Sequence, residues 1–230
     1  MREDRSASAN ARIGRIQPAD ARTDQGIRAQ LDEFARLIST WPGRMARTGR
    51  GLIDDSLVLL DHLGDARSLV DVGSGAGMPG IPIKIARPSL DVTLIEADQA
   101  KAAFLVHACA QLRLEHVEVV ARRAEEAGHD ARLREAFDVA VARALAPLPV
   151  LVELCLPLVR LGGRLLAQKT AGEDPSGAVA AIELMGGKLS HVASAPSAAR
   201  TAGTIVVIEK VRPTPSRYPR RPGVPARKPL

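Results

Sequence analysis

Four closely spaced glycines and two acids stand where they could hold a nucleotide-like ligand. The apolar run Ser68–Val72 ends in the glycine-rich stretch Gly73–Gly80, and a glycine loop that follows a strand commonly cradles part of a nucleotide. Asp71 lies inside that run, and Glu96 ends the next apolar run, about 20 residues further on. These residue types at this spacing predict a binding site for a nucleoside.

The glycine spacing alone does not decide which nucleotide is bound. Counted from Gly73, the dinucleotide pattern G-x-G-x-x-G requires a glycine where the chain has Met78. Counted from Gly75, the pattern is met through Gly77 and Gly80. A P-loop is excluded because no Gly-Lys-Ser/Thr follows. A dinucleotide site and a glycine turn in a sugar- or anion-binding domain both stay open on this spacing.

The two acids favour a nucleoside without phosphates. An acid at Asp71 would repel a pyrophosphate, whereas it can meet loop amides or the ammonium group of a ligand. Glu96 stands at the position of a carboxylate that accepts ribose hydroxyls. Both features suit S-adenosylmethionine, which carries an ammonium and a sulfonium. For Asp71, a hydrogen bond that organises the loop is an equal alternative.

The elements that must position these residues follow an alternating pattern. Strands are predicted at 68–72, 91–97, 117–121, 137–144 and 163–169, with helices near 80–87, 99–113, 124–135 and 147–160. This alternation predicts a doubly wound, mostly parallel α/β sheet with right-handed crossovers. The runs 188–196 and 203–211, joined by a short loop, predict an antiparallel hairpin at the sheet edge. Ligands of such sheets bind at the carboxyl ends of the strands, where the glycine loop lies.

The two ends of the chain differ from this central part. Apolar residues at helical spacing predict a helix over Ile27–Trp41, and Asp54–Ala66 predicts a second helix that stops at Gly64. We therefore expect a flexible N-terminal segment and helical cap over 1–65, an α/β domain over 66–211 and a basic tail over 212–230. The tail holds six prolines and is expected to be extended and ordered only by docking.

Charge and composition indicate a polyanionic partner and a reducing compartment. Residues 210–230 hold seven Lys or Arg and no acid, residues 1–50 hold ten Arg and six acids, and the middle of the chain is acidic. Cys109 and Cys155 are predicted to be buried thiols, and five scattered histidines favour no metal site. No apolar leader or membrane-length run is seen, so we expect a soluble, cytoplasmic monomer.

A longer stretch makes the interpretation specific. The segment LVDVGSGAGMPGIPIKIARP resembles the motif of the RsmG (GidB) family, bacterial methyltransferases that act on guanine N7 of 16S ribosomal RNA. The resemblance continues through FDVAVARALAPL, GGRLLAQKTAG, IVVIEK and the tail YPRRPGVPARKPL, and covers roughly residues 66 to 230. It implies a Rossmann-like class I methyltransferase fold, S-adenosylmethionine as donor and 16S ribosomal RNA or the small ribosomal subunit as acceptor. The stretch RMARTGRGLIDDS lacks the family's usual Asn-Leu-Thr and Arg-His elements.

The resemblance also implies roles for single residues. Gly73 and Met78 would lie at the methionine end of the cofactor, Ala124 and Glu125 would lie against the adenine, and Arg143 would sit where cofactor and substrate meet. With the residues argued above, the predicted cofactor contacts are Asp71, Gly73, Ser74, Gly75, Gly77, Met78, Glu96, Ala124, Glu125 and Arg143. The predicted RNA contacts are Lys101, Arg123, Lys169, Arg200, Arg220 and Arg221.

The chemistry of this reaction explains why the sequence shows no candidate for a general base. Guanine N7 has a lone pair and no proton to lose, so in-line methyl transfer needs positioning rather than a general base. Arg143 is the predicted catalytic residue, as a donor to O6 of the guanine; its alternative role is a strand-end ion pair. Two other functions stay open: a methyltransferase of this fold for another RNA or a small molecule, and a non-catalytic RNA-binding ribosome-assembly factor. Removing the tail is expected to weaken RNA binding and to leave cofactor affinity unchanged.

Overall fold

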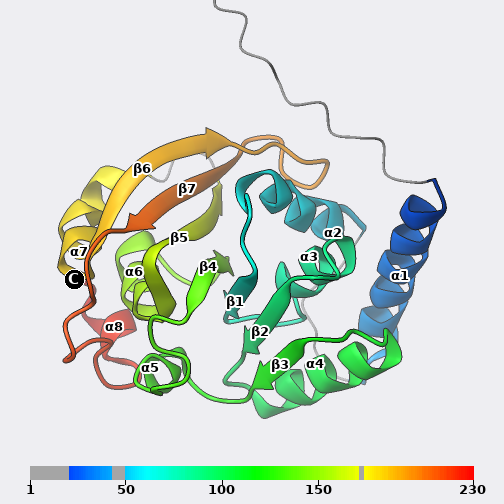
Figure 1. Ribbon diagram of the computed structural model, residues 1–230, viewed down its shortest axis with the longest axis horizontal. Coiled ribbons are helices and arrows are strands. Elements are labelled where there is room, and N and C mark those ends of the chain that lie inside the picture. Colours follow the sequence, from blue (N-terminus) through cyan, green and yellow to red (C-terminus); the bar gives the residue numbers. More distant parts are fainter. Residues whose placement is uncertain (1–20, 43–49, 171–173) are drawn as a thin grey trace, which may run out of the picture.

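The computed structural model describes residues 21–42, 50–170 and 174–230 (Figure 1). Its strands are β1 (Ser68–Val72), β2 (Asp91–Ile95), β3 (Val117–Val120), β4 (Phe137–Arg143), β5 (Val159–Thr170), β6 (Gly187–Ser194) and β7 (Gly203–Lys210). They form one seven-stranded sheet in the order β3-β2-β1-β4-β5-β7-β6. The first five strands of this order run parallel, and β7 pairs antiparallel with both β5 and β6. The predicted fold class, including the C-terminal hairpin, is confirmed.

Helices cover both faces of this sheet. The α-helices are α1 (Ala21–Thr40), α2 (Arg50–Leu57), α3 (Gly80–Ala86), α4 (Gln99–Gln111), α5 (Ala124–Ala127), α6 (Leu148–Cys155), α7 (Val179–Leu184) and α8 (Val224–Arg227). The first four contribute to one apolar core, and α5, α6 and α7 contribute to the other (Figure 1). In β4, Val139 and Val141 point into the first core, whereas Ala140 and Ala142 point into the second. The sheet is therefore buried on both faces, as parallel sheets require.

Two predicted helices are shorter than expected. The helix expected over 124–135 ends as α5 at Ala127, because the next residues bind the C-terminal tail instead: the Arg134 guanidinium donates to the carbonyls of Gly128 and Tyr218, at 2.7 and 2.8 Å. The helix expected over 147–160 ends as α6 at Cys155 and continues only as the 3₁₀ turn Leu156–Leu158, which contains Pro157 and leads directly into β5. The sequence predicted no helix at α7.

The helices of the N-terminal cap also differ from the predicted ones. Helix α1 begins at Ala21, six residues before the predicted start, and residues 1–20 lie outside the described part. The predicted second helix is α2 followed by a 3₁₀ turn over Val58–His62. Gly64, with a φ of +57°, lies just beyond that turn, as predicted. Phe34 of α1 and Ile53 of α2 are buried in the same core as α3, so the cap packs directly on the sheet domain.

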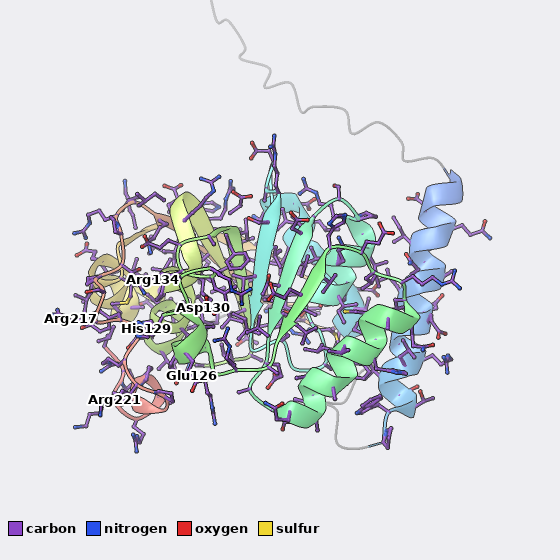
Figure 2. The ribbon with its side chains drawn as sticks, turned by 60° about the horizontal axis from the view of Figure 1, so that its bottom comes forward. Glu126, His129, Asp130, Arg134, Arg217 and Arg221 are labelled. Atoms are coloured by element: carbon purple, nitrogen blue, oxygen red, sulfur yellow. The ribbon has the colours of Figure 1, made fainter. Side chains whose placement is uncertain are left out.

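The C-terminal tail is docked on its own chain. Arg220 meets the fully buried carboxylate of Glu153, with Nε donating to Oε1 at 2.8 Å and Nη2 to Oε2 at 2.5 Å. His129 Nε2 lies 2.7 Å from the carbonyl oxygen of Pro219. Figure 2 shows Arg217 and Arg221 on the tail, close to the segment that carries His129 and Arg134. The expectation that the tail is extended is wrong for Val224–Arg227, because α8 forms there with Pro225 in its first turn, where no N–H is needed.

Candidate functional site

Six amide groups of the glycine loop between β1 and α3 are hydrogen-bonded within the protein. The amides of Gly73 and Ser74 donate to the carbonyl of Ile95, and those of Gly77 and Met78 donate to the carbonyl of Ser74. The Gly75 amide donates to Glu96 Oε2 at 2.8 Å, and the Gly80 amide donates to Asp71 Oδ2 at 2.9 Å. A pyrophosphate binds such a loop through free amides. The open dinucleotide alternative is therefore disfavoured, because these six amides are already bound.

Asp71 supports the loop from below. Its side chain is completely buried. Asp71 is also absent from the described residues that line the neighbouring cavity, which is described next. Burial raises the pKa of this carboxyl to about 7, against the Gly80 amide and the charge of Arg143, which lower it. The geometry thus supports the alternative in which Asp71 organises the loop and the start of α3 through a hydrogen bond. Direct contact of Asp71 with the cofactor stays a prediction.

A cavity of about 400 Å³ opens above the loop, and we call it the loop cavity. It lies at the carboxyl ends of β1, β2 and β4, as the fold predicts. Its lining comprises Leu52, Val72, Gly73, Ser74, Gly75, Ala76, Met78, Ile95, Glu96, Ala97, Lys101, Arg122, Arg123, Ala124, Glu125, Arg143, Ala144 and Leu145. Eight of the ten predicted cofactor contacts therefore line this one cavity, whereas Asp71 and Gly77 do not. Gly77 has φ +85°, and its Cα faces Ile81, where a Cβ would meet that side chain at 2.5 Å.

Two carboxylates in the loop cavity are held by backbone amides. Glu96 accepts from Gly75 through Oε2 and from Asp98 through Oε1, each at 2.8 Å. Glu125 Oε1 accepts from the amide of Gly223 in the C-terminal tail at 2.9 Å. Both side chains are nearly buried, and both line the cavity. A carboxylate oxygen has further lone pairs, so each can still accept a hydroxyl or amine of a ligand.

A second cavity of about 840 Å³ adjoins the first, and we call it the arginine cavity. Its lining comprises Leu52, Asp55, Arg143, Ala144, Leu145, Ala146, Pro147, Gln168, Lys169, Thr170 and Arg200. Leu52, Arg143, Ala144 and Leu145 belong to both cavities and form the wall between them. Apolar side chains make up one part of the arginine cavity, and three cationic side chains make up another. Such a lining suits a flat, apolar ring system attached to an anion.

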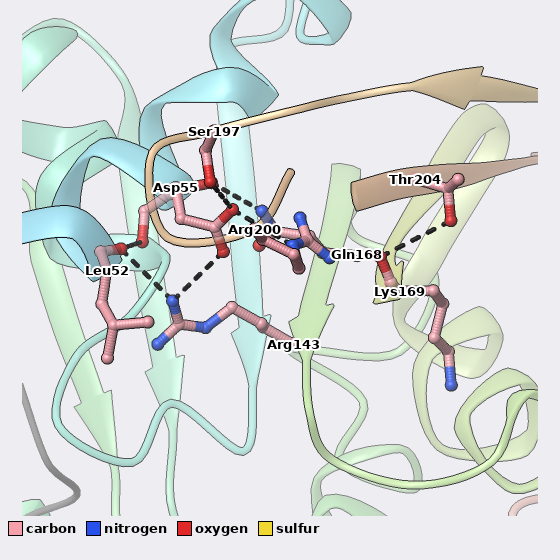
Figure 3. A network of polar contacts seen from close by, with 9 residues as sticks. Leu52, Asp55, Arg143, Gln168, Lys169, Ser197, Arg200 and Thr204 are labelled. Carbon is pink, nitrogen blue, oxygen red and sulfur yellow. Dashed lines mark hydrogen bonds and ion pairs between the residues drawn. The ribbon is translucent and has the colours of Figure 1, made fainter. Parts of the chain in front are cut away.

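Two of the three cations of the arginine cavity, Arg143 and Arg200, converge on one buried acid, whereas Lys169 Nζ donates to the carbonyl of Ala146. Figure 3 shows Asp55 between Arg143 and Arg200. Arg143 Nη1 donates to the carbonyl of Leu52 at 3.2 Å and lies 3.7 Å from Asp55 Oδ2. Arg200 Nε donates to Asp55 Oδ1 at 3.1 Å. Burial lowers the pKa of Arg143, and Asp55 opposes this. The predicted alternative role of Arg143, an ion pair at the strand end, is thus present together with its place in both cavity walls.

Comparison with known proteins identifies the family. Residues 42–200 match the family described as rRNA small subunit methyltransferase G (GidB). The chain belongs to this family. The ribosomal RNA small subunit methyltransferase G of Chloroflexus aggregans is 44% identical over 191 residues, which cover 81% of this chain and 79% of the relative. That of Roseiflexus sp. strain RS-1 is 44% identical over 217 residues, with 87% and 92% covered.

Solved structures similar to this GidB-family chain share its fold. The mitomycin 7-O-methyltransferase MmcR superposes with a TM-score of 0.58 at 17% identity, covering 83% of this chain and 69% of that chain. A 16S rRNA N2 methyltransferase (RsmC) of T. thermophilus, solved with AdoMet and guanosine, has a TM-score of 0.51 at 17% identity, covering 76% of this chain and 42% of that chain. These likenesses confirm the Rossmann-like methyltransferase fold.

The six predicted RNA contacts of this family member fall into three groups. Lys101 and the exposed Arg123 line the loop cavity, whereas Lys169 and Arg200 line the arginine cavity. Arg221 is exposed on the tail. Arg220 is the exception: its guanidinium is bound to Glu153 and also donates to the carbonyl of Lys228. The guanidinium of Arg220 is thus engaged within the protein, and its contact with RNA stays a prediction. The ring of Tyr218, next to Pro219 in the tail, is only 8% exposed.

The sequence did not predict the residues that surround Arg143 and Arg200 in the arginine cavity. Asp55 lies near the start of the second predicted helix, and neither this residue nor Leu52, Gln168 or Ser197 was predicted to belong to the site. Ser197 Oγ donates to Asp55 Oδ1 at 2.6 Å, and Gln168 Nε2 donates to the Asp55 carbonyl at 2.6 Å. No local pattern marks these residues, because their contacts join segments more than a hundred residues apart. In the part of the chain that the structure describes, no helix could cross a membrane, and no three His, Cys, Asp or Glu cluster as metal ligands.

Proposed function

We propose that this chain transfers the methyl group of S-adenosylmethionine to guanine N7 of 16S ribosomal RNA. Its family members are small-subunit rRNA methyltransferases by name, which makes the chain an S-adenosylmethionine-dependent enzyme of that class. The single observation that most supports the reaction is the shared wall of the two cavities: a ligand in each would meet at Leu52, Arg143 and Leu145. With such a substrate, the enzyme acts in the cytoplasm, where small subunits are assembled.

The loop cavity fits the proposed cofactor. Its loop amides are bound internally, which suits a nucleoside that carries no phosphate. In this proposal Glu96 binds the ribose, Ala124 and Glu125 contact the adenine, and Gly73 and Met78 lie at the methionine end. All five residues line the loop cavity. When bound, S-adenosylmethionine supplies a methyl group on a positively charged sulfur. The chain's own residues hold this group and exclude water from it.

The arginine cavity fits a purine that has left its stack. Enzymes that act on a base in RNA must first extrude it, and a flipped base lies between flat or apolar side chains. Leu52, Leu145 and Pro147 supply such surfaces. Arg143 stands at the junction of the cavities, where it can donate to O6 of guanine and align the neighbouring N7.

The reaction needs no proton acceptor from this chain. Guanine N7 carries a lone pair and no proton, so positioning on the methyl–sulfur axis is the main requirement. Among the described residues that line the arginine cavity there is no histidine, and its acid, Asp55, is engaged by two guanidinium groups. A group held in this way is a poor general base. The composition of the cavity is thus consistent with direct transfer.

The decisive experiment is methyl transfer with a labelled donor. Purified protein is incubated with labelled S-adenosylmethionine and with small ribosomal subunits that lack the modification, and the modified base is mapped. We expect label in 7-methylguanine of 16S ribosomal RNA. Label in another base, or only in a small molecule, would contradict the proposed acceptor. Absence of cofactor binding by calorimetry would contradict every enzymatic function and would favour an RNA-binding assembly factor.

A further inference from the structure

Among the described residues that line the arginine cavity, Asp55 is the one acid among three cations. Its side chain is 4% exposed, and it lies on α2 of the N-terminal cap rather than on the sheet. Each of its carboxylate oxygens serves a different arginine: Oδ2 faces Arg143 Nη1, and Oδ1 accepts from Arg200 Nε. The acid therefore lies between the two guanidinium groups at the wall (Figure 3).

The two arginines would not keep these positions on their own. Both side chains are mostly buried, at 17% and 15% exposure, and the charge of Arg200 lowers the pKa of Arg143. Like charges this close repel each other strongly where water is scarce. Without a negative charge between them, only backbone carbonyls would oppose this repulsion: that of Leu52 for Arg143 and that of Lys169 for Arg200.

Asp55 is itself fixed from several sides. Ser197 Oγ donates to Oδ1, and the backbone carbonyl of Asp55 accepts from Gln168 Nε2 of β5, each at 2.6 Å. Arg143 Nη1 also donates to the carbonyl of Leu52, one turn earlier in α2. Helix α2 thus presents to Arg143 both a carbonyl and a carboxylate, and both lie close to the Nη1 atom of the guanidinium and orient it. In the described part of the chain, Arg200 Nη2 has no hydrogen-bond partner.

We propose that Asp55 is a positioning residue for methyl transfer, which holds Arg143 and Arg200 at the wall of the arginine cavity in the orientation that aligns the acceptor base. This inference rests on the proposed function, because the arginine cavity is there the acceptor site. It assigns a role to the N-terminal cap: the cap completes the acceptor site through one carboxylate. Asp55 does not touch the cofactor side, since it is absent from the described lining of the loop cavity.

Asp55→Asn is the sharpest test, because it keeps the size of the side chain. Its remaining oxygen still accepts from Ser197 and Arg200, but its NH₂ group faces Arg143 Nη1, donor against donor. With saturating cofactor and small subunits, we expect kcat to fall about a hundredfold, the size of effect produced by misplacing a reacting group by about 1 Å. The Kd of S-adenosylmethionine should stay within about threefold of the wild type.

A matched control is Asp54→Asn, which makes the same charge change one residue earlier in α2. Asp54 lines neither cavity, and we expect kcat near that of the wild type. If Asp55→Asn does not fold, Ser197→Ala replaces it: losing one hydrogen bond to the carboxylate should lower kcat about fivefold. A parallel loss of cofactor affinity, thermal stability and turnover in Asp55→Asn would show a purely structural role and overturn the proposal, as would unchanged turnover.

One readout does not depend on activity. The side-chain Nε–Hε and Nη–Hη signals of Arg143, assigned with an Arg143→Lys variant, report by nitrogen-15 NMR how well the guanidinium is ordered. We expect slow guanidinium rotation in the wild type and fast rotation in Asp55→Asn, with Asp54→Asn like the wild type. An unchanged Arg143 signal would refute the inference. Failure of the wild type to methylate small subunits would instead refute the proposed function and leave this measurement to decide the role of Asp55.

Discussion

The two adjoining cavities are built in different ways. The loop cavity is built around the backbone of one short segment, Gly73–Gly80, which is bound to Glu96 at the end of the next strand. Most of its other lining residues follow β2, β3 and β4. The arginine cavity is shaped by side chains from α2, from the end of β4, from β5 and from the segment 197–200. Asp55 and Arg200, which meet there, are 145 residues apart in the chain.

This difference separates a part of the site that enzymes with different acceptors can share from a part that is specific to one acceptor. A loop whose amides are bound locally keeps its shape in many proteins of this fold, and it holds the same cofactor for different acceptors. An acceptor site made of long-range side-chain contacts can change with the substrate without disturbing the loop. Each cavity also receives a support from one end of the chain: Asp55 of the cap serves the arginine cavity, and the Gly223 amide of the tail holds Glu125 in the loop cavity.

Gly75→Asp is expected to break the loop cavity alone. A Cβ at this position would meet no atom closer than 3.9 Å, so the fold has room for it, but the new carboxylate would enter the cavity beside Glu96. Two like charges and a filled cavity should weaken S-adenosylmethionine binding by more than about a hundredfold, as measured by calorimetry. Unchanged affinity would mean that the cofactor binds elsewhere.

The control for this variant is Gly162→Asp. Gly162 also has a positive φ, +77° against +57° for Gly75, and a Cβ there would meet only Arg160, at 3.6 Å. Both variants therefore carry a similar backbone strain, about 1 kcal/mol. Gly162 lies outside the loop cavity, so cofactor affinity should match that of the wild type. The two variants together separate strain from loss of the site.

The loop cavity could be predicted from the sequence because its signals are local. Strand β1, the glycines and Glu96 lie within one βαβ unit, and periodicity places them at the carboxyl edge of the sheet. Even here, the spacing could not show that the Gly80 amide binds Asp71 and not a ligand. Three residues of the arginine cavity, Arg143, Lys169 and Arg200, could be predicted only through the family resemblance, which gave no reason for two of them to meet at Asp55.

The tail shows a second limit of sequence reasoning. A run of basic residues and prolines looks the same whether it is solvated, binds RNA or packs on its own domain. The residues that hold the tail on the domain are Glu153 and Arg134, which lie in distant segments. The sequence predicts only that both segments are helical. Because the tail holds Glu125 through Gly223, its removal should also reduce cofactor affinity, contrary to what the sequence suggested.

Arg220→Ala tests this support of the loop cavity. It would leave the fully buried Glu153 carboxylate without its cation and release the tail that carries Gly223. Removing one partner of a buried pair costs about 3–5 kcal/mol; Arg220 is one-quarter exposed, so we expect about 2 kcal/mol less unfolding free energy by chemical denaturation. Cofactor affinity should fall as well, by about fivefold. A variant as stable as the wild type would show that the tail is only loosely attached.

The neighbouring Arg221→Ala provides the contrast. Arg221 is exposed, so its loss should change stability by less than about 0.5 kcal/mol. If it contacts phosphate, RNA affinity should fall, and the slope of log affinity against log salt should decrease by about 1. An unchanged slope would remove the tail from the proposed RNA surface. Two adjacent arginines would thus separate the structural part of the tail from its RNA-binding part.

The buried acid Asp71, which binds the Gly80 amide, should make the stability of the protein depend on pH. Burial raises the pKa of Asp71 to about 7, above the 3.8 of an ordinary Asp, so the folded protein holds this proton more tightly than the unfolded chain. The free energy of unfolding therefore decreases as the pH rises from about 4 to about 7, and this contribution is constant above that range. Asp71→Asn can still accept from the Gly80 amide but has no charge to bury. Its stability relative to the wild type should increase by about 1 kcal/mol between pH 6 and pH 8, measured by urea denaturation without cofactor. A pH-independent difference would show that Asp71 does not titrate between pH 6 and pH 8 in the folded protein, and that burial of its carboxyl does not set the pH dependence of stability in this range.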